Sequence, residues 1–277
     1  MKLSTIHFRF SILLVFLAIT ATAQSVSEYA SVLANADWGW QSHNGVYYGK
    51  ATFTDLYGNP QMLSIAKYSE STMATMLFDK EHSSQGTNGL AVEAHATVAI
   101  NGSYFNMSNC TSCTGLWMYG SEIATTISDE FARCNGIIGF KDGVFTLEKY
   151  GNTTTASQLA AWGKKYDAFV VTGPILRLNG VSQNPYIGGE GFYGPHPRTL
   201  LGKCADGTVY MVVAEGRMDG ASGFSLPHLL NLAEDLGMTD AINLDGGGSS
   251  MMLVCGKELF KPSDGKQRAV GSCVYIL

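Results

Sequence analysis

The stretch Ala241-Ile242-Asn243-Leu244-Asp245-Gly246-Gly247-Gly248-Ser249-Ser250 places a glycine-rich turn at the end of a short apolar strand. A helix is predicted just before it, because Ser225 is a good N-cap, Gly237 is a good terminator, and leucines recur every three or four residues between them. The stretch therefore predicts a helix that leads into a buried strand. At the strand's end it places one carboxylate, three glycines and two hydroxyls.

Two interpretations of the turn remain open. Successive glycines allow peptide N–H groups to point toward one place, so Gly246, Gly247 and Gly248 are candidates for an anion-binding nest. Asp245 is then a group able to move a proton or to attack carbon. Alternatively, Asp245 only bonds the backbone of a strand-ending turn, and Ser249 and Ser250 only satisfy nearby N–H groups. The density of polar groups favours a functional site.

The rest of the pattern predicts an α+β fold with a mixed, largely antiparallel β-sheet and packed helices in a single compact domain. Strands outnumber helices and alternate with them irregularly. Helices are expected at 26–36, 87–95 and 155–162, and strands at 97–100, 169–171, 198–203, 208–214 and 269–276, with short β-like runs over 45–78. An Asp-Gly turn predicts a hairpin of 136–140 with 144–147, whereas 106–134 and 182–197 are expected to be loops.

The first residues predict export. Lys2 and Arg9 precede an uncharged apolar run, and Ala21-Thr22-Ala23 provides a small-residue cleavage site, which is the layout of a signal peptide over 1–23. The mature chain is expected to be secreted or periplasmic, without membrane insertion. Removing this segment changes the formal net charge of −5 by two units, to −7. An acidic chain of this kind argues against a nucleic-acid partner.

All six cysteines lie in the mature part. An even number in an oxidising compartment favours disulfides, although the sequence does not give their pairing.

Polar residues recur where predicted apolar strands end, and loops at such positions often carry function on a rigid support. Together they offer two carboxylates, three arginines, two asparagines and the glycine turn. The candidates are Asn101, Arg198, Thr199, Glu215, Arg217, the run 243–250 and Arg268.

Several motifs in one order resemble the phosphodiester glycosidase family. They are Asn-Gly-Ser-Tyr-Phe at 101–105, Thr-Gly-Pro-Ile-Leu at 172–176, Pro-Arg-Thr at 197–199, Asn-Leu-Asp-Gly-Gly-Gly-Ser-Ser at 243–250 and Arg-Ala-Val at 268–270. The resemblance covers 95–277, which we expect to be the family core, while 24–94 forms the N-terminal part of the domain and carries little that is diagnostic. Glu215-Gly216-Arg217 departs from the family's Asp-Gly-Arg.

The resemblance implies cleavage of a sugar's anomeric C1–O bond when that oxygen belongs to a phosphodiester, with an N-acetylglucosamine-type sugar favoured. Asp245 is the candidate nucleophile or base, and Glu215 its partner. The guanidinium groups of Arg198, Arg217 and Arg268 match phosphate oxygens in pairs. The residues expected to bind sugar hydroxyls or phosphate are Asn101, Thr199, Asn243, Gly246, Gly247, Gly248, Ser249 and Ser250.

Two other functions remain open. A non-catalytic carbohydrate or cell-wall-polymer binding protein would keep the groove without the chemistry. A phosphodiesterase that cleaves P–O usually needs clustered carboxylates and histidines for metal ions, and no such spacing occurs. No metal or cofactor is therefore expected. The absence of Gly-x-Ser-x-Gly also disfavours a serine nucleophile.

Overall fold

The computed structural model describes residues 27–70, 74–78, 95–110, 112–118, 121–124, 134–151, 155–186 and 190–277. The signal peptide expected at 1–23 lies outside these ranges, as does nearly all of the helix expected at 87–95. Within them, no helix is both long enough and apolar enough to cross a membrane.

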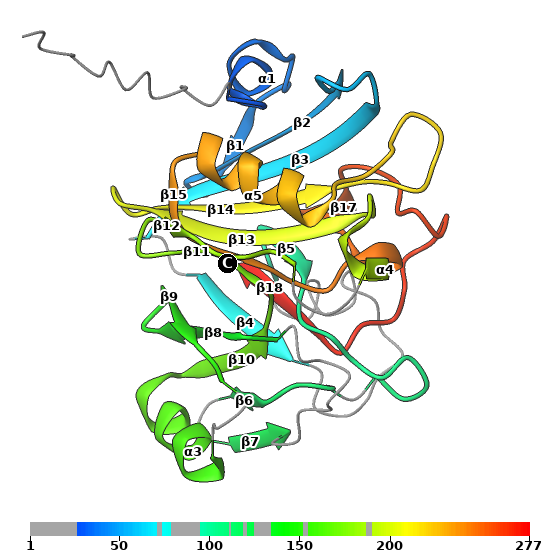
Figure 1. Cartoon of the computed structure of the whole chain (residues 1–277). Helices are drawn as coiled ribbons and strands as arrows, with labels where there is room; N and C mark the ends of the chain where they lie inside the picture. The colour runs from blue at the N-terminus through cyan, green and yellow to red at the C-terminus, as the bar shows by residue number, and fades with distance from the viewer. Residues whose placement is uncertain are drawn as a thin grey trace, which may run out of the picture.

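The largest sheet has eight strands, which come from both the N-terminal and the C-terminal parts of the chain (Figure 1). Its spatial order is β1-β2-β3-β14-β13-β15-β11-β12, and each neighbouring pair is antiparallel. The strands are β1 (Gln41–His43), β2 (Val46–Thr54), β3 (Pro60–Ser69), β11 (Ile175–Leu178), β12 (Val181–Ser182), β13 (Arg198–Cys204), β14 (Thr208–Ala214) and β15 (Met238–Asn243).

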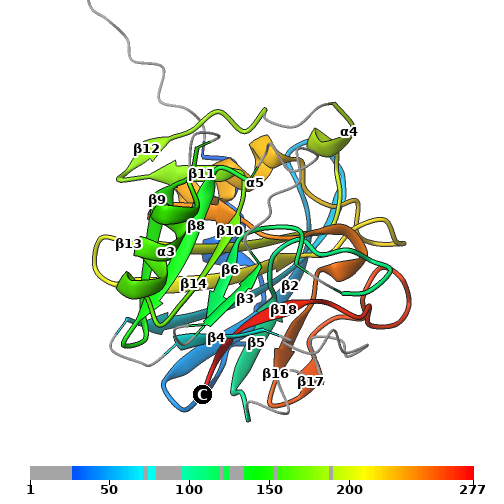
Figure 2. The same cartoon turned by 90° about the horizontal axis from the view of Figure 1, so that it is seen from below.

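Two five-stranded sheets lie below it in Figure 1, and Figure 2 shows the molecule from below. One has the order β7-β6-β10-β8-β9, with β6 (Leu116–Met118), β7 (Ser121–Ala124), β8 (Gly136–Lys141), β9 (Val144–Lys149) and β10 (Ala168–Thr172). The other has the order β17-β16-β5-β18-β4, with β4 (Ala74–Phe78), β5 (Val98–Asn101), β16 (Met252–Val254), β17 (Lys257–Glu258) and β18 (Ser272–Ile276).

The β8–β9 hairpin forms where the Asp-Gly signal predicts it. Lys141 pairs with Val144, so the loop has two residues, and both Asp142 and Gly143 have positive φ values of 52° and 80°. Two successive positive φ values match the twist of the flanking strands, and glycine adopts them without strain. The predicted hairpin is confirmed.

The described part of the chain contains four α-helices: α1 (Ala30–Asn35), α3 (Ala156–Lys165), α4 (Glu190–Tyr193) and α5 (Leu226–Asp235). Ser225 caps α5, because its hydroxyl accepts the N–H of His228 at 3.2 Å. The apolar face of α5 is buried against the eight-stranded sheet, together with Leu176, Leu200 and Val212. The predicted helices at 155–162 and after Ser225 are confirmed, and α4 lies inside the expected loop at 182–197.

The main core lies between the three sheets. It contains Tyr68 and Val213 of the large sheet, Ile138 of the second and Ile100 of the third, all buried. Each fully buried aliphatic side chain stabilises the fold by roughly 1.5–3 kcal/mol, so a core shared by all three sheets makes one folding unit. The predicted α+β class and single domain are confirmed, and all the strand pairs in the described part of the chain are antiparallel.

One prediction is corrected, and another is not confirmed. The stretch 106–134 contains β6 and β7, because Leu116 supplies apolar surface that the core buries, so it is not simply a loop. The structure does not show the disulfides that the even number of cysteines predicts. Cys204 ends β13, where its thiol donates to the Leu236 carbonyl oxygen at 3.4 Å, and Cys255 lies in the turn between β16 and β17 of another sheet. Disulfide stapling is therefore not confirmed.

Candidate functional site

The candidate residues gather where four strands end. In the antiparallel register, Arg198 at the start of β13 pairs with Ala214 at the end of β14, and Leu200 pairs with Asn243 at the end of β15. Asn101 ends β5 in a different sheet, yet it contacts the same region. The prediction that polar motifs follow apolar strands thus corresponds to one place in the molecule.

Asn101 holds the Asp245 segment in position. It is fully buried, and its Nδ2 donates to the Asp245 carbonyl oxygen at 2.8 Å. Its Oδ1 accepts the Thr199 hydroxyl at 2.7 Å and the Met251 N–H at 3.2 Å. The Thr199 hydroxyl also contacts Ser250 Oγ at 3.3 Å. Through these buried contacts, Asn101, Thr199 and Ser250 hold the glycine turn in position.

Asn243 is also fully buried. Its Nδ2 donates to the Leu244 carbonyl oxygen at 2.6 Å and to the Tyr104 hydroxyl at 3.1 Å. Its Oδ1 is buried and has no hydrogen-bond partner. A buried acceptor of this kind is unfavourable unless a bound group satisfies it. The structure therefore leaves one acceptor of Asn243 open beneath the turn.

The glycine turn does not form the predicted nest of three converging N–H groups. Gly246 N–H donates to the Asp245 Oδ1 at 2.8 Å, and Gly247 N–H donates to the Pro197 carbonyl oxygen at 2.9 Å. Residues Gly247–Ser249 form a 3₁₀ turn, in which Ser250 N–H donates to the Gly247 carbonyl oxygen. The N–H groups of Gly246 and Gly247 are thus directed into the protein, where they fix the turn and the Asp245 carboxylate.

The glycines are needed for close approach of three other segments. A Cβ at Gly246 would stand 2.8 Å from the Pro197 carbonyl oxygen, and one at Gly247, whose φ is +62°, would stand 3.1 Å from the nearest Arg217 guanidinium nitrogen. A Cβ at Gly248 would overlap the Asp264 carboxylate. A larger residue at any of the three positions would force a neighbour to move. Because the glycines have no side chain, the charged groups of Arg217 and Asp264 can lie directly against the turn.

Two of the three predicted arginines bond to other groups of the protein. Arg198 is 2% exposed, and its guanidinium donates to the carbonyl oxygens of Phe224 at 3.0 Å, Phe192 at 2.5 Å and Gly194 at 2.9 Å. Arg268 forms an ion pair with Asp264 at 2.6 Å, while its other terminal nitrogen lies 3.5 Å from Ser249 Oγ. Neither guanidinium is presented to solvent as an unneutralised cation.

Arg217 differs from both. It is exposed, and within the described ranges no carboxylate lies within 4.0 Å of it. Its Nε donates to the His196 Nδ1 at 3.2 Å. His196 was not among the predicted residues, although its position directly before Pro197-Arg198 was a signal that could have drawn attention to it.

Glu215 lies in an environment that suits an acid. It is 2% exposed, its Oε2 has no hydrogen-bond partner, and burial raises the pKa of its carboxyl to about 8, with repulsion from Glu258 adding to the shift. Ser64, which faces Val213 across β3 and β14, has a buried hydroxyl that also lacks a partner. At neutral pH the Glu215 carboxyl is therefore mostly protonated.

Pro197 joins the two carboxylate-bearing segments. A side chain at Gly216, next to Glu215, would stand 2.9 Å from the Pro197 nitrogen, and the Pro197 carbonyl oxygen accepts the Gly247 N–H. Asp245 is only partly buried, and its Oδ1 accepts the Gly246 N–H. The site thus holds a buried carboxyl group, Glu215, and a partly exposed, hydrogen-bonded carboxyl group, Asp245, on two segments that both contact Pro197, and such a difference in environment separates acid from base in many active sites.

A family model described as phosphodiester glycosidase matches residues 94–277, a range that contains every predicted site residue. The chain belongs to the phosphodiester glycosidase family. The family predicted from the motifs is confirmed, and family and fold together support a glycosidase type of function.

Solved structures share the family fold. The chain is similar to the catalytic domain of zebrafish N-acetylglucosamine-1-phosphodiester alpha-N-acetylglucosaminidase, with a TM-score of 0.66, 17% identity and coverage of 87% of this chain and 86% of that one. It is also similar to a hypothetical protein from Synechocystis, with a TM-score of 0.64, 16% identity and coverage of 84% and 62%. At these identities the likeness concerns the fold alone.

A curated relative is the SPbeta prophage-derived uncharacterized protein YomE of Bacillus subtilis strain 168. It is 40% identical over 81 residues, which make up 29% of this chain and only 13% of that protein. Because the match covers so little of the relative, the function of that protein cannot be assigned to this chain.

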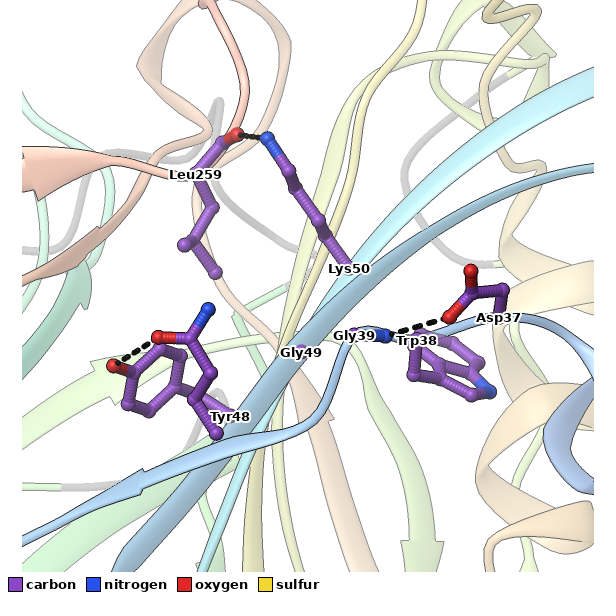
Figure 3. A pocket seen from close by; sticks show the side chains of 8 residues that line it. Asp37, Trp38, Gly39, Tyr48, Gly49, Lys50 and Leu259 are labelled. Carbon is purple, nitrogen blue, oxygen red and sulfur yellow. Dashed lines mark hydrogen bonds between the residues drawn. The ribbon is translucent and has the colours of Figure 1, made fainter.

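A separate hollow of about 240 Å³ lies over β2, away from the family site (Figure 3). Its polar side chains bond to their own surroundings: Lys50 Nζ donates to the Leu259 carbonyl oxygen at 2.5 Å, and Asp37 accepts the Gly39 N–H at 3.1 Å. None of the predicted site residues lines it. Within the described part of the chain, no cluster of three or more His, Cys, Asp or Glu is arranged to hold a metal ion.

Proposed function

We propose that this family member is an exported glycosidase that hydrolyses the anomeric C1–O bond of a sugar-1-phosphodiester, most readily one with an N-acetylglucosamine-type sugar. The observation that carries the proposal is the contrast between Glu215, buried with a pKa near 8, and the partly exposed, hydrogen-bonded Asp245 on the adjacent segment. Glycoside cleavage uses a pair of carboxyl groups with opposite protonation states.

In the proposed reaction, Asp245 acts at the anomeric carbon, either as the nucleophile or as the base that takes a proton from water. The C1–O bond breaks, C1 gains a hydroxyl from water, and the bridging oxygen leaves with the phosphate as a phosphomonoester. Glu215 gives its proton to that oxygen. The stereochemistry of the released sugar distinguishes the two roles of Asp245, because a covalent intermediate retains the anomeric configuration.

The sugar assignment draws on the zebrafish family member, whose name states an N-acetylglucosamine-1-phosphodiester substrate and an alpha linkage. The export assignment draws on the signal-peptide pattern at 1–23. Export to an oxidising compartment would permit the disulfides that the even number of cysteines predicts. A glycan or another sugar phosphodiester outside the cytoplasm is the expected substrate.

The test is sugar release from N-acetylglucosamine-1-phosphodiesters by the 24–277 protein in heavy-oxygen water. The variants are Asp245→Asn and Glu215→Gln, with Asp206→Asn as a matched control at the opposite end of the strands. We expect the label on the sugar, rate losses of about 10²–10⁴-fold for the two site variants, and little loss for the control.

Label on the phosphate would replace the proposal with P–O cleavage. Equal release by wild type and Asp245→Asn, with both folded, would remove Asp245 from the mechanism. Sugar binding without turnover of any diester would favour the alternative of a non-catalytic carbohydrate or cell-wall-polymer binding protein.

A further inference from the structure

Arg217 adopts a backbone conformation that arginine rarely takes. Its φ is +59°, in the left-handed region, where a residue with a Cβ is disfavoured by about 1 kcal/mol or more. Its neighbour Gly216 packs so closely against Pro197 and Gly223 that the chain has little freedom there. This backbone conformation directs the exposed Arg217 guanidinium toward the glycine turn, next to Gly247. The close contacts of Gly216 stabilise the strained backbone.

His196 fixes the direction of that cation. The His196 backbone forms an antiparallel bridge with Phe224, with N–H to oxygen distances of 3.2 and 3.0 Å. The backbone that carries the imidazole is therefore held in place. The His196 Nδ1 accepts the Arg217 Nε–H, which requires a ring that carries its proton on Nε2. With Nε hydrogen-bonded to His196, the terminal NH1 and NH2 groups of Arg217 form the remaining edge of the guanidinium, and both lie near Gly247.

The charges around this edge favour an anion. Within the described ranges Arg217 forms no ion pair with a carboxylate, Asp264 is paired with Arg268, and Glu215 is mostly protonated at neutral pH. The other acid of the turn, Asp245, accepts the Gly246 N–H. A guanidinium with two parallel N–H groups binds two oxygens of one phosphate in a fixed geometry, which the point charge of a lysine does not reproduce.

We infer that Arg217 and His196 form a phosphate-binding site, in which the NH1 and NH2 edge of Arg217 binds the phosphate oxygens and His196 acts as a positioning residue. The inference rests on the proposed function for its biological ligand, the phosphate of the sugar phosphodiester. It assigns this role to one of the three predicted arginines and adds a histidine that motif matching did not select.

The experiment is calorimetric titration of the 24–277 protein with inorganic phosphate, which needs no turnover. The variants are Arg217→Gln, Arg217→Lys, His196→Ala and His196→Asn, whose side-chain oxygen replaces the Nδ1 acceptor. Lys261→Gln is the control, because it removes the same charge from an exposed position. Thermal unfolding of each variant shows that it is folded.

We expect Arg217→Gln to weaken phosphate binding by about ten- to a hundredfold and Arg217→Lys by nearly as much, since a charged hydrogen-bond pair is lost in both. His196→Ala should weaken it several-fold, His196→Asn should recover most of that loss, and the control should stay within about twofold. With a cleavable diester, His196→Ala should raise KM more than it lowers kcat.

Unchanged binding in folded Arg217→Gln would overturn the site. Equal losses in His196→Ala and His196→Asn would overturn the positioning role. Acetate binding as tightly as phosphate would show that the site does not select phosphate, and would overturn the proposed binding of phosphate oxygens by the NH1 and NH2 groups of Arg217. Because the titration is independent of hydrolysis, a protein that binds phosphate through Arg217 but cleaves no sugar phosphodiester would support this site and reject the proposed function.

Discussion

Replacing Glu215 with glutamine tests whether this buried carboxyl is neutral in the folded protein. The structure raises its pKa from an ordinary value of 4.5 to about 8, because the side chain is 2% exposed and its Oε2 meets no donor. Glutamine has nearly the same shape as a protonated glutamate and never ionises. The variant therefore keeps the packing and removes only the titration.

The sign follows from proton binding. Between pH 4.5 and 8 the folded chain holds a proton that the unfolded chain has released, so stability falls as pH rises, and the fall ends above the folded-state pKa. The slope is about 1.4 kcal/mol per pH unit. Wild type and Glu215→Gln should thus be nearly equal near pH 4.5, and the variant should be more stable by about 3 kcal/mol at pH 7.

The assay is urea unfolding of both proteins at pH 4.5, 6, 7 and 8.5. All other titrating groups are common to the two proteins, so the difference between the curves reports Glu215 and its coupling to Glu258. A difference that stays constant with pH would refute the raised pKa. If Glu215 is also the acid of the proposed reaction, wild-type kcat should fall as pH rises through about 8, because the proton is then lost.

Three further changes probe the turn. Asn101→Ala should reduce the free energy of unfolding by about 2–3 kcal/mol, because it leaves the Asp245 carbonyl oxygen without its buried donor; urea unfolding measures this, and a loss below 1 kcal/mol would contradict it. Gly248→Ala should lower the melting temperature, because its Cβ would overlap Asp264, and an unchanged melting temperature would show that the loop gives way without loss. Arg268→Gln should change stability by only about 0–1 kcal/mol by the same assay, since its ion pair is partly exposed.

Local signals predicted the parts of the fold that local contacts determine. The Asp142-Gly143 turn and the Ser225 cap depend on residues a few positions apart, and both appear where the sequence places them. The strands at 116–124 have no such signal. β6 is a strand because it pairs with β10, and that pairing depends on a partner about fifty residues away. Short strands of this kind are determined by tertiary contacts more than by their own pattern.

The motifs selected the right region of the chain but not the role of each residue. Arg198 and Arg217 look equivalent in the sequence, since each is an arginine at a strand end. Arg198 donates to carbonyl oxygens of Phe192 and Phe224, while Arg217 remains exposed. Side-chain direction separates them: Arg198 lies on the face of β13 that packs under α5, as Leu200 does, and alternation along a strand becomes informative only when the helix position is known.

Part of the surroundings of Glu215 comes from β3, which precedes all the family motifs in the sequence. β14 ends against β3, where the Glu215 N–H donates to the Met62 carbonyl oxygen at 3.0 Å, and Gln61 accepts the Gly223 N–H at 3.2 Å. β3 therefore packs against the segment that carries Glu215, and burial of the carboxyl is the main cause of its raised pKa. An acid assembled in this way needs β3 as well as the family motifs, because a core lacking β3 would lose the strand that pairs with β14 up to Glu215, and a more exposed Glu215 would return toward an ordinary, ionised carboxylate.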